Sequence, residues 1–160
     1  MKYISLILLA LTFLSCDKDE NNESFNVESQ IWVSYIDPDG NDLLKSLGEE
    51  TISKFRLYYL ENDKKVLYQK SNLDAPYGIT LVKPENGEGL YQLRLVLYNP
   101  PTEGEQTQGT TYVRWEDGRE DEILAEFSNG QDHRTITKFR YNEKEGTMDD
   151  VRNFVYTVDQ

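Results

Sequence analysis

A short stretch around residue 40 carries oxygen ligands of the kind that hard cations prefer. Asp37, Asp39 and Asn41 stand at alternate positions, like the first ligands of a calcium loop. The match then fails, because an EF-hand loop that began at Asp37 needs a glycine where Asp42 stands and a bidentate glutamate where Gly48 stands. Pro, Asp, Gly and Asn all form turns, so a turn is the favoured interpretation and calcium the alternative. We expect no metal site.

Residue types that serve in catalysis are present, but their spacing does not bring them together. His133 is the single histidine, and its neighbour Asp132 faces the opposite side if both lie on a strand. Five acids between residues 116 and 122 surround a turn, and a solvated hairpin tip explains them better than a site. Neither a Gly-x-Ser-x-Gly elbow nor a phosphate-binding glycine loop occurs. We therefore expect no enzyme activity, no catalytic residue and no cofactor.

Four aromatic residues are candidates for ligand contact: Trp32, Tyr58, Tyr59 and Trp115. Exposed rings of this kind stack on sugars and contact partner proteins. Trp115, however, shares a strand face with Val113, and the adjacent Tyr58 and Tyr59 must point to opposite faces. Each ring is therefore expected in the core more often than on the surface, and the ligand-binding residues stay unassigned.

Composition sets the fold class and excludes one kind of partner. The 160 residues are 38% hydrophobic and 12% aromatic, which is enough apolar material for a core. Alanine occurs only three times, whereas Tyr, Val, Ile, Thr and Phe are plentiful, so strands are favoured over helices. The formal net charge of −12 is repelled by phosphate backbones, which excludes nucleic acid.

The first sixteen residues have the form of a lipoprotein leader. Met1-Lys2 is followed by an apolar run over residues 4–14, which is too short to span a bilayer as a helix. The triplet Leu14-Ser15-Cys16, which holds the only cysteine, resembles a bacterial lipobox, so we expect residues 1–15 to be a signal peptide and Cys16 to be acylated. An ordinary secretory leader is the alternative. Acylation of Cys16 leaves no thiol for disulfides, thiolate metal sites or catalysis.

An export signal is the expectation for the residues just after the cysteine. Lys18, Asp19 and Glu20 resemble the surface-export signal of Bacteroidetes lipoproteins, which implies a location on the outer face of the outer membrane. Residues 16–28 are polar and acidic, so they also suit a flexible tether between the lipid and a single domain over residues 29–160.

Alternating apolar and polar residues predict about nine strands in that domain. In the clearest of them, Leu93, Leu95 and Leu97 share a face that should point inward. Asp-Gly and Asn-Gly pairs mark tight turns, Asp42 and Gly48 bound one expected helical turn, and residues 154–158 favour a closing strand. The strands are expected to start near Ile31, Ile52, Val66, Tyr77, Leu90, Thr110, Ile123, Arg134 and Val151.

Three phrases in the chain are similar to phrases of uncharacterised Bacteroidetes lipoproteins: DPDGNDLL at 37–44, RLYYL at 56–60 and ITKFRYN at 136–142. The resemblance implies an all-β, antiparallel, immunoglobulin-like β-sandwich and brings no activity with it. The expected function is a surface-anchored, non-catalytic binding module for a glycan, a peptide or a partner protein. The alternative is a structural or assembly component of the cell envelope.

A long polar connection over residues 99–109 is the expected place for binding, because loops at the ends of sandwiches carry function. Hairpins need only two to five residues, so this length is unnecessary for folding. A tolerated insertion is the slightly favoured interpretation, and under either one shortening residues 102–108 to a two-residue linker is expected to leave the melting temperature nearly unchanged.

Overall fold

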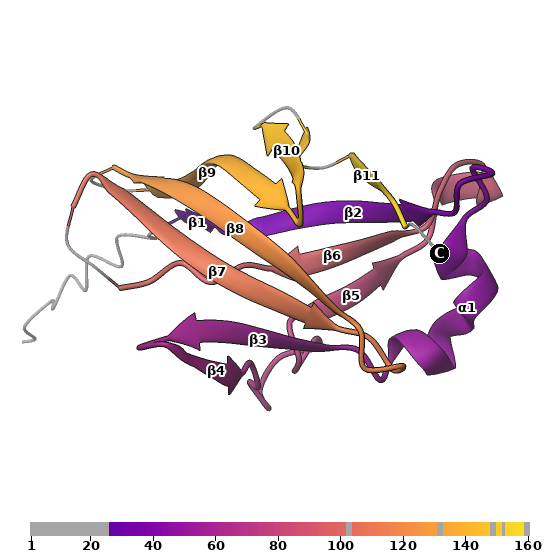
Figure 1. Cartoon of the computed structure of the whole chain (residues 1–160), viewed down its shortest axis with the longest axis horizontal. Helices are drawn as coiled ribbons and strands as arrows, with labels where there is room; N and C mark the ends of the chain where they lie inside the picture. The colour runs from indigo at the N-terminus through magenta and orange to yellow at the C-terminus, as the bar shows by residue number, and fades with distance from the viewer. Residues whose placement is uncertain (1–25, 102–103, 131–132, 148–149, 152, 159–160) are drawn as a thin grey trace, which may run out of the picture.

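The computed structural model describes residues 26–101, 104–130, 133–147, 150–151 and 153–158. Within them, two β-sheets enclose one hydrophobic core, and a helix lies at one end of the sandwich (Figure 1). The larger sheet has the order β1-β9-β8-β7-β3-β4, with β10 beside β9, and the smaller has the order β11-β2-β6-β5. The strands are β1 (Asn26–Glu28), β2 (Gln30–Ile36), β3 (Arg56–Glu61), β4 (Lys64–Leu67), β5 (Ile79–Val82), β6 (Gln92–Val96), β7 (Gln106–Arg114), β8 (Glu120–Asn129), β9 (His133–Tyr141), β10 (Lys144–Thr147) and β11 (Phe154–Thr157).

The strand order is that of an immunoglobulin domain. In the smaller sheet, β2, β6 and β5 take the places of strands B, E and D, and in the larger sheet β8, β7, β3 and β4 take those of G, F, C and C′. The predicted all-β sandwich is thus confirmed. The described residues form eleven strands rather than about nine, and two pairs, β1 with β9 and β11 with β2, are parallel. β1 begins at Asn26, inside the stretch 16–28 that the sequence analysis assigns to the tether.

Turn residues set the hairpins between paired strands. Gly118, between β7 and β8, has a φ angle of 88°, as the predicted tight turn requires. Asn86 and Gly87 also have positive φ angles, 60° and 76°, but they lie in a 3₁₀ helix (Glu85–Gly87) within the long connection between β5 and β6, so the tight hairpin turn predicted there is wrong. The β3–β4 hairpin turns without glycine, because Asn62 and Asp63 take φ angles of 49° and 60°. Asn and Asp tolerate this conformation better than other side chains do.

In the described part of the chain one α-helix, α1 (Leu43–Ile52), joins β2 to β3. Its predicted cap is confirmed, since Asp42 Oδ1 accepts a hydrogen bond from the Lys45 backbone N–H at 3.0 Å. Gly48 interrupts the helix with a φ of 76°, but a second turn follows it. Ile52 therefore ends the helix instead of starting a strand as predicted, and β3 begins at Arg56.

The core lies between the two sheets, and the predicted leucine face supplies part of it. Leu93 and Leu95 are fully buried and Leu97 is 2% exposed. Gln92 and Arg94, which alternate with these leucines, are half-buried. The alternation predicted for this strand is confirmed. Each buried leucine contributes about 1.5 to 3 kcal/mol to folding, which is large beside the net stability of a domain.

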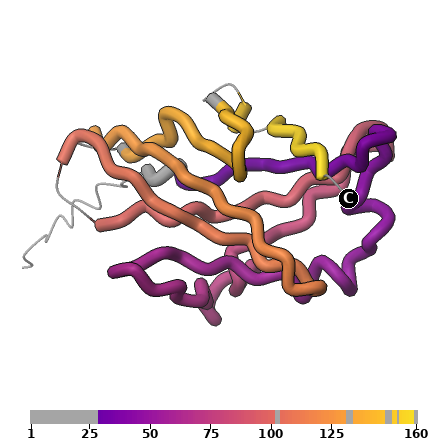
Figure 2. The backbone as a smooth tube through the Cα atoms, in the orientation of Figure 1, coloured from indigo at the N-terminus to yellow at the C-terminus, as the bar shows by residue number. Residues whose placement is uncertain are grey.

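The connection between β6 and β7 is shorter than the predicted loop over residues 99–109. β7 already begins at Gln106, and Thr107 and Gly109 pair with β8. A Cβ atom on Gly109 would lie 1.8 Å from the Tyr98 carbonyl oxygen, so the chain leaving β6 packs directly on β7. Figure 2 shows both ends of the connection at the same end of the sandwich. Excision of residues 102–108 would remove paired strand residues, so the expectation of an unchanged melting temperature is wrong.

Candidate functional site

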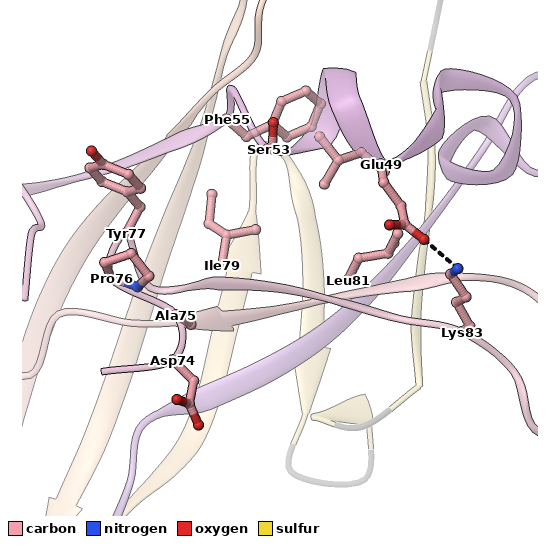
Figure 3. A pocket seen from close by; sticks show the side chains of 11 residues that line it. Glu49, Ser53, Phe55, Asp74, Ala75, Pro76, Tyr77, Ile79, Leu81 and Lys83 are labelled. Carbon is pink, nitrogen blue, oxygen red and sulfur yellow. Dashed lines mark ion pairs between the residues drawn. The ribbon is translucent and has the colours of Figure 1, made fainter. Parts of the chain in front are cut away.

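A hollow of about 510 Å³ opens between α1, the segment 74–77 and β5 (Figure 3), and we call it the α1–β5 hollow. Ile52 and Phe55 belong to the core and form one part of its apolar lining. Ile79 and Leu81 are half-buried side chains of the edge strand β5, and they form another part. The volume is within the range of small-molecule sites, and an apolar lining is typical of them.

The rim of the α1–β5 hollow is charged. Glu49 on α1 forms an ion pair with Lys83, which follows β5, and their side chains are 68% and 55% exposed. The hydrogen bond from Lys83 lowers the pKa of Glu49, so this carboxylate is charged at neutral pH. An ion pair this exposed adds little to the stability of the fold. A charged ligand could therefore replace Glu49 or Lys83 as the partner of the other at a small cost in free energy.

Tyr77 forms a wall of the α1–β5 hollow, and Arg56 fixes its ring. The Arg56 guanidinium lies 3.8 Å from the ring centroid, while its Nη1 donates to the carbonyl oxygens of Ser53 and Phe55 at 2.8 and 2.7 Å. Gly78 follows with a φ of 74°, and a Cβ there would lie 2.9 Å from side-chain atoms of Leu57. Glycine therefore allows this close approach of the segment to the core, and Arg56 packs on the face of the Tyr77 ring.

The polar groups that line this hollow do not form a nucleophile–base pair. The hydroxyl of Ser53 donates to the Glu50 carbonyl oxygen at 2.6 Å, and the charges of Glu49 and Lys83 are paired with each other. Asp74 is the remaining charged residue of the lining and is exposed. What the arrangement offers is an apolar surface with an aromatic wall and a charged rim, which suits binding.

A second hollow, of about 410 Å³, lies beside the edge strand β4, and we call it the tyrosine groove. Tyr59 stacks on Tyr98 with ring centroids 5.0 Å apart and packs on Tyr68 at 5.2 Å. The Tyr59 hydroxyl donates to the Val96 carbonyl oxygen at 3.0 Å, which ties β3 to the opposite sheet. Burial raises the pKa of Tyr59, so the phenol keeps its proton. Of these three rings, only Tyr59 was a candidate from the sequence. Tyr68 and Tyr98 contact it only because the fold brings them together.

The acidic stretch near residue 40 forms a closed turn. Asp37 Oδ1 accepts from the Asn41 backbone N–H at 2.8 Å, and Oδ2 accepts from Asn41 Nδ2 at 2.9 Å. These hydrogen bonds lower the pKa of Asp37. Asp39 is exposed on the same turn. Among the described residues, no group of three or more His, Cys, Asp or Glu side chains is placed to hold a metal ion.

The acidic cluster at 116–122 divides between surface and core. Glu116 is exposed and pairs with Lys54, and Asp117 is exposed at the turn, as the hairpin-tip interpretation expects. Glu120 accepts from Arg114 Nε at 2.8 Å and from Lys65 at 2.5 Å. Asp121 departs from that interpretation, because it points into the core and is 5% exposed.

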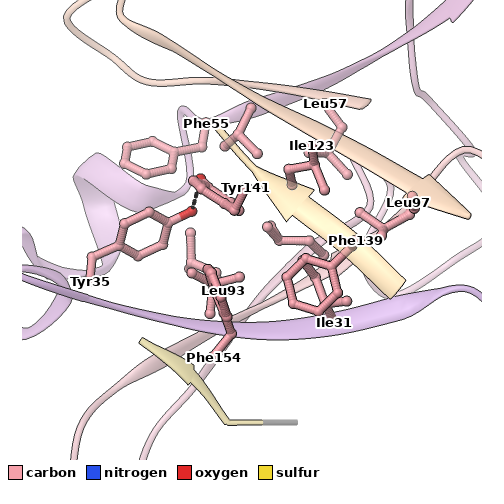
Figure 4. Packing of buried hydrophobic residues seen from close by; sticks show 14 of the residues in the cluster. Ile31, Tyr35, Phe55, Leu57, Leu93, Leu97, Ile123, Phe139, Tyr141 and Phe154 are labelled. Atoms are coloured by element: carbon pink, nitrogen blue, oxygen red, sulfur yellow. Dashed lines mark hydrogen bonds between the residues drawn. The ribbon is translucent and has the colours of Figure 1, made fainter. Parts of the chain in front are cut away.

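Asp121 is the centre of a buried hydrogen-bond network. Its Oδ2 accepts from Trp115 Nε1 at 2.7 Å and from the Tyr141 hydroxyl at 2.9 Å, and its Oδ1 accepts from Asn142 Nδ2 at 3.0 Å. The Tyr141 hydroxyl also contacts that of Tyr35, as the dashed line in Figure 4 shows. Burial raises the pKa values of Tyr35 and Tyr141, so both phenols stay protonated.

The other residues singled out by the sequence lie in several places. Trp115 is 4% exposed, so the core interpretation is right for it, whereas Trp32 and Tyr58 are half-buried. The Tyr58 ring lies 4.3 Å from the Arg114 guanidinium. His133 begins β9. The residues Cys16, Lys18, Asp19 and Glu20 lie outside the described part of the chain.

Comparison with known proteins adds no relative to this geometry. No family model matches the chain, no curated protein matches it, and no solved structure matches it. None of the helices in the described residues has the length and apolar character needed to cross a membrane.

Proposed function

We propose that this chain is a lipoprotein anchored in the outer membrane through Cys16 and facing the cell exterior. Its β-sandwich acts there as a non-catalytic binding module for a glycan, a peptide or a partner protein. The leader before Cys16 supports the anchor, and Lys18, Asp19 and Glu20, which resemble an export signal of Bacteroidetes lipoproteins, support the location.

The observation that carries the binding role is the α1–β5 hollow. Ile79 and Leu81 keep apolar surface open to it on an edge strand, although burial of that surface would stabilise the fold. Arg56 holds the Tyr77 ring in place beside them. A fixed aromatic wall next to an apolar lining loses little conformational freedom when a ligand binds, which favours affinity.

The experiment uses two variants that each lose one tyrosine–arginine contact. Tyr77→Ala removes the wall of the α1–β5 hollow and the contact with Arg56, whereas Tyr58→Ala removes the contact with Arg114 on β7. The full chain in detergent is screened on glycan and peptide arrays and in pull-downs of surface proteins. For any ligand retained, we expect Tyr77→Ala to weaken binding about tenfold or more and Tyr58→Ala to leave it unchanged.

Two results would contradict the proposal. Full affinity in Tyr77→Ala would remove the α1–β5 hollow from the site. The absence of any retained glycan, peptide or surface protein would contradict a binding module altogether.

An assembly role is the second candidate, and the edge strand β4 favours it. Val66 and Leu67 are 42% and 39% exposed on this strand, and Leu73, in the segment after it, is 46% exposed. Apolar residues on an unpaired edge suit contact with a neighbouring protein. This role predicts that Val66→Ser with Leu67→Ser removes cross-links to neighbouring surface proteins and leaves array binding intact.

A further inference from the structure

A third hollow, of about 190 Å³, lies where four segments meet beside α1, and we call it the Arg119 hollow. Asp37 comes from the turn after β2, Leu43 and Leu47 from α1, Asp117 and Arg119 from the β7–β8 turn, and Val158 from the residue after β11. It shares no lining residue with the α1–β5 hollow. Figure 1 shows the end of β11, which Val158 follows, at the same end of the sandwich as α1.

Among the described residues, the arginine in this hollow forms no ion pair with an acidic side chain. The Arg119 guanidinium carbon lies over the Trp115 ring, 3.8 Å from its centroid, and the buried Nε atom of Arg119 makes no hydrogen bond. Within the described residues Arg119 forms no ion pair, whereas Arg114, five residues earlier, binds Glu120 through Nε and Nη2. A buried donor without an acceptor is costly, and Arg119 lines the hollow, so a ligand with hydrogen-bond acceptors would stabilise its guanidinium.

The platform under the guanidinium is rigid. Trp115 Nε1 donates to the buried Asp121, and the Trp115 ring packs edge-on against Tyr35 with centroids 4.9 Å apart. The Trp115 backbone N–H donates to the Arg119 carbonyl oxygen at 2.9 Å, so the two residues are also joined across the turn. Arg119 is thus oriented before any ligand arrives, which lowers the entropic cost of binding.

Two carboxylates, those of Asp37 and Asp117, line the hollow together with Arg119. Asp37 is held by Asn41, and Asp117 Oδ1 accepts from the Arg119 backbone N–H at 2.9 Å. Two negative charges against one positive charge give the hollow a net negative charge, so a simple anion is repelled. A ligand that satisfies Arg119 must therefore carry a positive group as well as a carboxylate.

The remaining lining is aliphatic. Leu43 is half-buried, Leu47 is 37% exposed, and Val158 is 9% exposed. A cavity of about 150 Å³ can hold benzene, so this hollow has room for one small molecule and too little for a chain of sugars or residues. An aliphatic group on the ligand would cover the exposed part of Leu47.

We infer that the Arg119 hollow binds a small zwitterion with an aliphatic side chain, that is, a free α-amino acid of the size of leucine. Its carboxylate binds the guanidinium of Arg119, which can present two N–H groups to it. Its ammonium group faces Asp37 and Asp117, and its side chain packs on Leu43 and Leu47. This site is separate from the α1–β5 hollow, so its failure would leave the proposed function untouched.

Three probes separate the parts of this ligand: L-leucine, N-acetyl-L-leucine, which lacks the positive charge, and L-leucinamide, which lacks the carboxylate. The full chain in detergent is titrated with each by calorimetry. We expect L-leucine to bind best and each derivative to bind about tenfold or more weakly, since each loses one charged hydrogen-bond partner. Binding of L-leucine no tighter than that of both derivatives, or none at about 10 mM, would overturn the inference.

Two variants assign the site. Arg119→Gln should weaken L-leucine binding about tenfold or more and affect L-leucinamide much less, because a neutral amide oxygen accepts a weaker hydrogen bond from the guanidinium than a carboxylate does. Arg114→Gln is the matched control and should bind all three probes like the unmodified chain. Unchanged L-leucine affinity in Arg119→Gln would contradict the assignment. In the unmodified chain, the Trp115 indole N–H resonance should shift with L-leucine, and a fixed resonance would contradict it as well.

Discussion

The buried carboxylate of Asp121 shows how a single residue organises one end of this core. Three donors from β9, from the end of β7 and from the turn after β9 converge on its two oxygens, and Trp115 and Tyr141 are themselves buried. A buried carboxylate is tolerated only when hydrogen bonds replace its hydration. Since the same indole supports Arg119, the network links the core to the surface of the Arg119 hollow.

Asp121→Ala should therefore lower the free energy of unfolding by about 3 kcal/mol or more, because it leaves several buried donors without an acceptor. Glu122→Ala, one residue further along β8, is the control and should change stability by no more than about 0.5 kcal/mol. Urea unfolding followed by circular dichroism measures both. Similar losses in the two variants would show that Asp121 is not the centre of the network.

Asp121 was predictable from its spacing, although the sequence analysis placed it at a solvated tip. Asp121, Ile123, Ala125 and Phe127 alternate along β8, and all four are buried. The neighbouring acids Glu120 and Glu122 made Asp121 look like part of a charged surface cluster, although it stands at an inward-facing position of the alternating strand pattern. The contacts of Arg119 and Tyr77 were not predictable in this way. Trp115 meets Arg119 across a turn, and Arg56, at the start of β3, meets Tyr77 only through the fold.

At the scale of the elements, β6 is the central strand on which the smaller sheet depends. It pairs with β2 on one side and with β5 on the other, and Leu93 and Leu95 point from it into the core. Arg94, between them, points to the other face, where its Nη2 donates to the Thr80 hydroxyl at 3.2 Å. A strand in this position has little freedom to shift its register.

Leu95→Asp should consequently unfold the domain, because a buried and unpaired charge costs several kcal/mol. Arg94→Asp, with the same new side chain one position earlier, should cost about 1 kcal/mol or less. Thermal melts of the two variants decide between them. Equal melting temperatures would mean that the two faces of β6 are not distinguished by burial.

The elements that the sequence predicted well are those in which periodicity and turn chemistry agree. β6, β8 and the Asp117-Gly118 turn are examples. β7 starts earlier than predicted, because its first residues Gln106, Thr107 and Gln108 are polar and are strand only through pairing with β8. The β3–β4 turn was missed because Asn62 and Asp63 carry no glycine signal. Pairing and context decide these places, and a single sequence shows neither.

At the scale of the whole molecule, the candidate binding surfaces and the strand β1 lie on different parts of the sandwich. The α1–β5 hollow and the Arg119 hollow both use α1, the tyrosine groove lies beside β4, and β1 begins the described chain at Asn26 in a pair with β9. β1 and β4 are at opposite ends of the path through the larger sheet. A tether that enters through β1 therefore joins the domain far from the exposed residues of β4.

The proposed lipid anchor and the proposed export signal can be tested separately in living cells. Replacing Lys18, Asp19 and Glu20 with alanine should leave incorporation of labelled fatty acid unchanged, because Cys16 is intact. The protein should then be hidden from protease added to whole cells. Cys16→Ser should instead abolish the label, since the thiol is the acylation site.

The two variants test different steps. Buried acyl chains contribute about 0.8 kcal/mol per CH₂ group to membrane binding, and this contribution does not depend on the charge of the residues that follow Cys16. Persistent labelling of Cys16→Ser would contradict the lipid anchor. Unchanged protease cleavage of the triple-alanine variant would mean that the acidic stretch serves only as a tether. In that case the hollows of the sandwich would still be available to a ligand, since neither depends on residues before Asn26.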